Sequence, residues 1–267
     1  MEAYPLVIIA VLMSLAMAFA WAVQRATGLS GWIDTIWSLA VGVGGIFATV
    51  FAYGAFDRRM IVLFLVALWS LRLASHIGAR THGSKEDPRY AKLLEEWGEK
   101  AARRLFIFLQ VQAVAAFILV LAIYLAAGNA ADFFRPQDVV AIIVGLVALC
   151  GETLADAQLA RFRKSPRATT EICEVGIWRY SRHPNYFFEW LFWCCFPLFA
   201  LDLTIASWLS LLAPIMMYWL LVHVSGIPPL EEYMLRSRGD KFRAVQNRVN
   251  AFFPGPRKSV SQLRGEP

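Results

Sequence analysis

Two pairs of polar side chains stand out in an otherwise apolar sequence. Glu152 and Asp156 are four residues apart, and so are Asn185 and Glu189. Residues at positions i and i+4 share one face of a helix, so each pair predicts a polar helix face. Carboxylates accept hydrogen bonds, whereas an amide both donates and accepts. Together, the two faces can bind a polar ligand.

Other ionisable residues interrupt hydrophobic runs. Asp34 and Arg72 are the clearest cases. Charged groups inside membrane spans are costly and are functional candidates by default. A structural ion pair between Asp34 and Arg72 is the alternative interpretation. His223, near the end of a run, fits an interface anchor better than a catalyst.

The elements that must position these residues are predicted to be membrane helices. The sequence is 58% hydrophobic and 17% charged, which is too apolar for an ordinary soluble domain. A helix needs about 20 apolar residues to cross a bilayer, and its backbone polar groups must be satisfied internally. Seven runs meet this need, at roughly 4–24, 30–55, 60–80, 104–128, 138–159, 184–201 and 204–225. We therefore predict an all-α integral membrane bundle of seven transmembrane helices. Residues 1–255 would form a single domain, and residues 256–267 a disordered tail.

Basic residues alternate between the predicted connections. All but four of the 26 Lys and Arg residues are Arg25 or lie in segments 80–104, 159–183 and the tail after 226. The four are Arg58, Arg59, Arg72 and Arg135. The positive-inside rule then places the N-terminus outside and the C-terminus in the cytoplasm. Membrane topology thus explains the net charge of +6, and no nucleic-acid partner is implied.

This topology places the polar residues of five helices at one depth, near the cytoplasmic side. They are Asp34 and Trp37; Arg72, Ser75 and His76; Glu152 and Asp156; Asn185 and Glu189; and Tyr218 and His223. We expect them to form one cavity open to the cytoplasm. The basic segments at its mouth favour an anionic ligand, and the apolar surroundings favour a lipid-like second substrate.

Several local patterns have structural interpretations. The GVGG run at 42–45 lies in a predicted membrane helix, where close helix packing explains it better than dinucleotide binding. Four cysteines form no CxxC pair, so neither a metal site nor a disulfide framework is suggested. Pro88 predicts the start of a short cytoplasmic helix, and the tail is predicted to be helical from about Leu230 to Val249.

The block DAQLARFRKSPRATTEICEVGIWRYSRHPNYFFEW resembles the C-terminal half of steroid 5α-reductases and their bacterial relatives. The matching positions are Asp156, Arg163, Gly176, Tyr180, Asn185 and Glu189. The resemblance covers residues 140 to 255 and is weaker through the first 130. It implies a seven-span fold and NADPH-dependent reduction of a carbon–carbon double bond conjugated to a ketone. The implied substrate is a 3-oxo-Δ4-steroid, reduced at C4=C5, or a similar apolar enone lipid.

The resemblance also implies roles for individual residues. Asp156, Arg163, Asn185 and Glu189 would hold the dinucleotide, and we expect further cofactor contacts from Glu152, Tyr180, Arg182, His183 and Tyr233. The group for a 2′-phosphate is open among Arg161, Arg167, Arg179 and Arg182. Asp34 falls near a family glutamate that grips the ketone, and Trp69 falls near a family tyrosine. Asp34, if protonated, would polarise the carbonyl, with Trp69 and Arg72 beside it.

Two other function classes stay open. RHPNY followed by PPLEEYMLRSRGDKFRAVQNRVNAFFP is also similar to membrane methyltransferases that act on isoprenylcysteine or phospholipid. These bind S-adenosylmethionine, and Glu231 and Glu232 would then belong to the cofactor site. A non-enzymatic protein that binds lipid or sterol is the third hypothesis, but it leaves the dinucleotide-like block unexplained.

Overall fold

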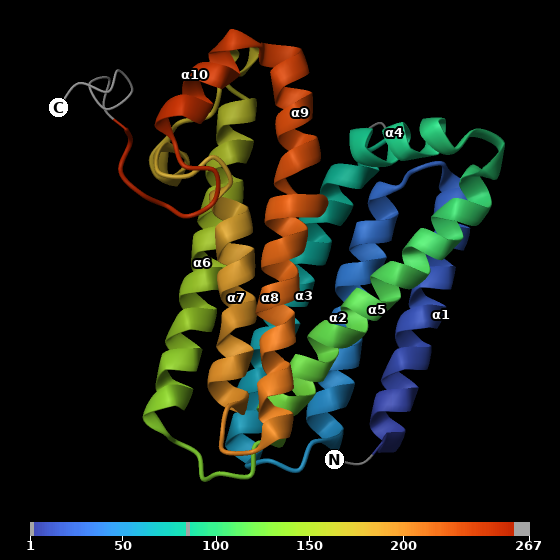
Figure 1. Ribbon diagram of the computed structural model, residues 1–267, viewed down its shortest axis with the longest axis vertical. Helices are drawn as coiled ribbons and strands as arrows, with labels where there is room; N and C mark the ends of the chain where they lie inside the picture. The colour runs from blue at the N-terminus through green and yellow to red at the C-terminus, as the bar shows by residue number, and fades with distance from the viewer. Residues whose placement is uncertain (1–2, 84–85, 259–267) are drawn as a thin grey trace. The chain divides into compact units, whose positions relative to one another are not determined.

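The computed structural model describes residues 3–83 and 86–258, and in these residues it contains helices but no β-strand (Figure 1). This confirms the predicted all-α class. The long helices are α1 (Ala3–Thr27), α2 (Gly31–Phe51), α3 (Phe56–His82), α5 (Ala101–Gly128), α6 (Pro136–Arg163) and α7 (Pro184–Ala200). Shorter helices are α4 (Pro88–Trp97), α8 (Leu212–Trp219), α9 (Ile227–Arg238) and α10 (Asp240–Arg248). All four cysteines are free thiols.

Six helical segments of the described chain are long and apolar enough to cross a membrane. They are Tyr4–Thr27, Gly31–Phe51, Phe56–His82, Arg89–Gly128, Pro136–Arg163 and Ile205–Arg238. The predicted span at 184–201 forms α7, which has only 17 residues. At 1.5 Å per residue it is about 26 Å long, whereas a bilayer core is about 30 Å thick. The protein therefore has six candidate spans of full length, and α7 is shorter.

The chain divides into two compact units where the sequence predicted one domain. The first unit contains residues 1–142 and 195–213, and the second contains residues 143–194 and 214–267. Each unit is described by itself below. Most of the predicted disordered tail, residues 259–267, lies outside the described residues.

Helix α2 packs against α1, α3 and α5 within the first unit. Its glycines make this packing close. A β-carbon at Gly42 would lie 2.1 Å from the Ser70 hydroxyl oxygen on α3, and one at Gly45 would lie 2.8 Å from Val66. Any larger side chain would separate the helices, so the packing interpretation of the GVGG run is confirmed.

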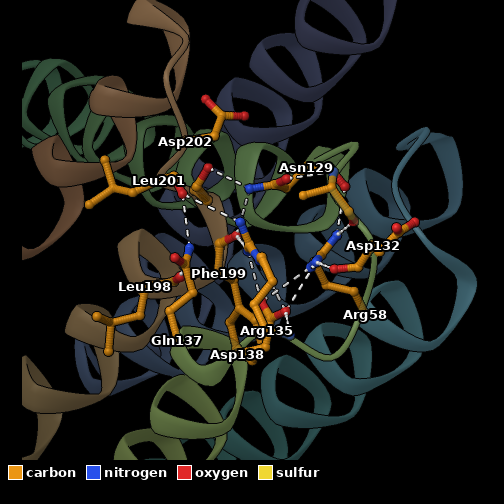
Figure 2. A network of polar contacts seen from close by, with 12 residues as sticks. Arg58, Asn129, Asp132, Arg135, Gln137, Asp138, Leu198, Phe199, Leu201 and Asp202 are labelled. Atoms are coloured by element: carbon orange, nitrogen blue, oxygen red, sulfur yellow. Dashed lines mark hydrogen bonds and ion pairs between the residues drawn. The ribbon is translucent and has the colours of Figure 1, made fainter.

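A buried polar network joins one end of α3, α6 and α7 within the same unit (Figure 2). The Arg58 guanidinium is fully buried, forms an ion pair with Asp138 at 3.1 Å and donates to the carbonyls of Asn129, Ala131 and Asp132. The side chain of Asn129 in turn donates to the last carbonyls of α7, those of Phe199 and Ala200. The network thus satisfies backbone groups that a helix end leaves open.

The second unit contains most of α6 and α7 and the C-terminal helices. A β-carbon at Gly151 of α6 would lie 2.4 Å from the Phe188 ring of α7, so these helices also approach closely. The segment between them is anchored by Trp178, whose indole donates to the Ala155 carbonyl at 2.9 Å. Tight packing therefore fixes the polar residues of α6 and α7.

The structure confirms one predicted terminal element and corrects another. α4 begins at Pro88, as predicted, and the Asp87 carboxylate caps it by accepting from the Arg89 amide at 2.9 Å. The predicted continuous helix from Leu230 to Val249 is instead two helices, α9 and α10. Gly239, with φ of +51°, interrupts them, because only glycine adopts this left-handed conformation at low cost.

Candidate functional site

Three predicted cofactor residues lie on one face of α6. A helix turns 100° per residue, so Glu152, Asp156 and Arg163 fall within about 40° of one another. Along the axis they extend over about 16 Å, from the buried Glu152 to the exposed Arg163. Such a line of acid, acid and guanidinium suits an elongated ligand with an amide or hydroxyl at one end and a phosphate at the other.

The structure brings the two predicted polar faces together. The Asn185 amide donates to the Asp156 carboxylate at 3.4 Å, across α6 and α7. This distance is longer than the usual 2.7–3.2 Å of such a bond, so the contact is weak. A ligand that offers better donors and acceptors can therefore replace it at little cost.

Glu189 lies one turn further along α7 and is only 6% exposed. Its carboxylate accepts from the Trp193 indole at 2.9 Å. A carboxylate can accept more than one hydrogen bond, so Glu189 is a candidate to accept from a ligand amide. The predicted pairing of Asn185 with Glu189 as one polar face is consistent with this placement.

Arg182 and His183, both predicted to contact the cofactor, have a common partner inside the protein. Both contact the Glu231 carboxylate of α9, at 2.7 Å and 3.0 Å respectively. Arg182 also donates to the carbonyls of Gln246 and Val249, and the Gln246 side chain donates to Glu231 at 2.7 Å. The donors of Arg182 are thus engaged within the protein. Arg182 is the weakest of the four predicted candidates for a 2′-phosphate.

His183 is a buried anchor. It is 4% exposed, and its ring stacks on Tyr186 with centroids 5.5 Å apart. Burial lowers the pKa of His183 below its ordinary value of 6.5, and the hydrogen bond with Glu231 partly opposes this shift. The imidazole is therefore predominantly neutral at pH 7.

The C-terminal segment 249–258 lies against the RYSRHPNY loop. The Arg182 amide donates to the Asn250 carbonyl at 2.8 Å, and the Gly255 amide donates to the Tyr180 carbonyl at 3.0 Å. The Ser181 hydroxyl donates to the Phe252 carbonyl at 2.8 Å. These bonds fix the loop that leads into Asn185. The Tyr180 and Tyr233 side chains, both predicted to contact cofactor, are 45% and 53% exposed.

The predicted catalytic residues lie in the first unit, and Asp34 is part of a polar cluster there. It forms an ion pair with Arg89 at 2.7 Å and accepts from the Tyr90 hydroxyl at 3.0 Å. Gln112 donates to the same hydroxyl at 3.2 Å. Both Asp34 carboxylate oxygens are thus engaged within the protein, one by Arg89 and one by Tyr90.

Trp69 and Arg72 lie near one another on α3. Trp69 is fully buried and contacts Trp37 edge to face, with centroids 6.4 Å apart. The Trp37 indole donates to the Gln112 carbonyl at 3.2 Å, so Trp69 adjoins the Asp34 cluster. Arg72 is half-buried. The phenol expected at position 69 is absent, but Tyr90 provides one beside Asp34.

Several of these partners are not predictable from the sequence. Arg89, Tyr90, Gln112 and Gln246 carried no motif or helical spacing that linked them to the candidate residues. One signal was available for Glu231. Arg182 and His183 are adjacent, and a buried guanidinium needs an acidic partner, which Glu231 supplies. In residues 3–83 and 86–258, no three His, Cys, Asp or Glu side chains gather in a way that could hold a metal ion.

Comparisons with known proteins place the chain in a family. Residues 20–249 match the family model described as "Protein of unknown function (DUF1295)". An uncharacterized protein of Schizosaccharomyces pombe is 26% identical over 270 residues, which cover 88% of this chain and 75% of the yeast protein. No solved structure gives a significant match. Because the family model covers most of the sequence, the chain belongs to the DUF1295 family.

Proposed function

We propose that this protein is an NADPH-dependent membrane reductase that saturates the double bond of an apolar enone, with the C4=C5 bond of a 3-oxo-Δ4-steroid as the model substrate. The observation that carries the proposal is the contact of Asn185 with Asp156. It joins the two halves of the motif that resembles steroid 5α-reductases. Asp156 and Asn185 thus meet although they are separated by 29 positions in the sequence, which supports a shared site for the motif residues.

The donor set fits a nicotinamide dinucleotide. The Glu189 carboxylate can accept from the carboxamide amino group, and Asn185 can donate to its carbonyl. Arg163 is exposed at the end of α6 and offers a fork of donors for phosphate oxygens. When bound, the cofactor supplies a hydride for the β-carbon of the enone. The chain itself must bind the ketone and deliver the balancing proton.

We assign the ketone to the cluster of Asp34 and Tyr90. The Tyr90 hydroxyl is held between Asp34 and Gln112, and a phenol can donate to a developing enolate oxygen. Tyr90 would turn its single O–H from Asp34 to the enolate oxygen on substrate binding, while Gln112 continues to donate to the phenol oxygen.

The proposed setting is a bacterial inner membrane, with α7 as a seventh, short span. The N-terminus would lie outside, and the cofactor site would face the cytoplasm. The basic connections support this orientation through the positive-inside rule.

A cofactor binding experiment tests the proposal. We expect NADPH to raise the melting temperature of the purified protein in detergent, because a ligand that binds only the folded state stabilises it. The protein should also oxidise NADPH when testosterone or progesterone is added. Glu189→Ala should weaken NADPH binding by at least about tenfold, since hydrogen bonds to a charged group contribute about 1.5–3 kcal/mol.

The matched control is Glu232→Ala. Glu232 is exposed and pairs with Arg236 on the surface of α9, so its removal should leave NADPH affinity unchanged. Unaltered affinity in the Glu189 variant would reject the assignment of the nicotinamide site.

A methyltransferase is the second candidate, and one observation favours it. Glu231, the first of the paired acids, contacts Arg182 and His183 of the RHPNY motif, so the two parts of this resemblance meet. This hypothesis predicts stabilisation by S-adenosylmethionine and none by NADPH. One thermal-shift comparison therefore separates the two functions.

A further inference from the structure

An open cavity lies in the second unit, outside the residues assigned to the nicotinamide end of the cofactor. Its volume is about 430 Å³, which is within the usual range for small-molecule sites. The walls come from the end of α6, from segment 167–175 and from α10. Phe162, Ile172, Val175, Ala244 and Val245 form its apolar lining.

Three cations of the second unit line the same cavity. They are Arg167, Lys241 and Arg248, and the carboxylates of Glu171 and Glu174 lie among them. Arg167 pairs with Glu171 at 2.7 Å, and Arg248 pairs with Glu174. Arg257 also pairs with Glu174, at 2.9 Å. The cations therefore exceed the acids, and the cavity favours an anion.

Hydrogen bonds from side chains to backbone carbonyls fix segment 168–170 at the edge of the cavity. Lys241 donates to the Thr170 carbonyl at 3.0 Å, and Arg238 donates to the carbonyls of Ala168 and Thr169. The hydrogen bond from Arg167 lowers the pKa of Glu171, and the nearby charge of Lys241 contributes in the same direction. Arg167 and Lys241 thus act on the same carboxylate from two segments 74 positions apart. An anion at this place would meet both.

The cavity adjoins the predicted phosphate ligand of α6. Phe162, the residue before Arg163, lines the cavity and packs against the buried cluster that contains Cys173. Cys173 stands between Ile172 and Glu174, which both line the cavity. Asp156 and Arg163 share one face of α6. A phosphorylated ligand that extends along this face from Asp156 would therefore reach Arg163 next to this cavity.

We propose that the cavity binds the adenosine end of the cofactor, with its 2′-phosphate between Arg167 and Lys241. The apolar lining accepts the base, and the surplus of positive charge selects the phosphomonoester. This inference rests on the proposed function and deepens it, because it makes the protein specific for NADPH over NADH. It also disfavours S-adenosylmethionine, which carries no phosphate.

Adenosine 2′,5′-bisphosphate tests the site without the nicotinamide. We expect it to bind the full-length protein in detergent, as measured by calorimetry, whereas adenosine 5′-monophosphate should bind at least about tenfold more weakly. Lys241→Ala and Arg167→Ala should each weaken the bisphosphate and NADPH by about tenfold and leave NADH affinity unchanged. Both side chains are exposed, so these variants should fold normally.

Arg243→Ala is the control, because Arg243 is an exposed cation on α10 that does not line the cavity. Wild-type bisphosphate and NADPH affinities in the Lys241 and Arg167 variants would overturn the inference, and an equal loss in the Arg243 variant would do the same. If NADPH binds normally but no enone is reduced, the proposed reaction fails while this site stands. If neither NADPH nor the bisphosphate binds, both fail.

Discussion

Arg182 and His183 share one carboxylate in the second unit, and this arrangement has a consequence for pH. Glu231 accepts from both side chains, and the neutral imidazole of His183 is buried. Protonation would place a second cation beside the Arg182 guanidinium in a site with little water. The folded state therefore resists the charged imidazole, which is why the pKa of His183 is below 6.5.

We predict that the protein loses stability as the pH falls below about 6.5. Between that value and the lower folded pKa, the unfolded chain binds one more proton, so acid favours unfolding by roughly 1.4 kcal/mol per pKa unit of difference. Melting temperatures from pH 7.5 to 5 measure this slope. His183→Asn should flatten it. His82→Asn changes an exposed histidine and should keep it. An unchanged slope in the His183 variant would contradict the assignment.

At the scale of elements, α7 ends in a cap built by side chains from distant segments. Gln137 donates to the carbonyls of Leu198 and Leu201, while Asn129 and Arg135 donate to that of Phe199 (Figure 2). If α7 is the proposed seventh span, its end has little access to water, and unsatisfied carbonyls in lipid cost several kcal/mol each. The cap explains how a 17-residue helix can end there.

Arg58 organises this cap, and its loss should be severe. Arg58→Ala would leave the buried Asp138 with one cation fewer and would remove the donors of three carbonyls. We expect the free energy of unfolding in detergent to fall by about 3–5 kcal/mol. Arg104→Ala, an exposed cation on α5, should change it by less than about 0.5 kcal/mol. Equal stabilities of these two variants would show that the network contributes little.

At the scale of the whole molecule, the arginines of the connections poor in basic residues are engaged internally. Arg58 and Arg135 belong to the α7 cap, and Arg59 donates to the carbonyls of Thr49 and Val50 near the end of α2. They act as helix caps rather than as exposed charges. In the proposed orientation, the connections that carry many basic residues, such as 159–183, lie on the cytoplasmic side.

Reporter fusions at the two termini test the number of spans. With α7 as a seventh span, the termini lie on opposite sides of the membrane. A C-terminal fluorescent protein should then be active in the cytoplasm, and an N-terminal periplasmic reporter should be active outside. A fusion at 129–135, between α5 and α6, should report the outer side and serves as the internal control. Both termini on one side would reject seven spans.

The sequence by itself determined the long helices and the two polar helix faces. An apolar run of about 20 residues must form a helix in lipid, because its backbone polar groups have to bond to one another. A spacing of four places Glu152 with Asp156, and Asn185 with Glu189, on shared helix faces. Pro88 likewise predicted the start of α4, because proline suits the first turn of a helix.

Only the tertiary structure decided the partners of the charged residues. His183 meets Glu231 across 48 positions, and Tyr90 meets Asp34 across 56. Helical periodicity relates residues only a few positions apart, so it carries no information on such pairs. Which acid neutralises a given cation depends on how helices pack and where the chain turns, as at Gly239 between α9 and α10. For that reason Arg182 forms a buried ion pair with Glu231 and Arg167 lines an open cavity. In the sequence, both were equal candidates for binding a 2′-phosphate.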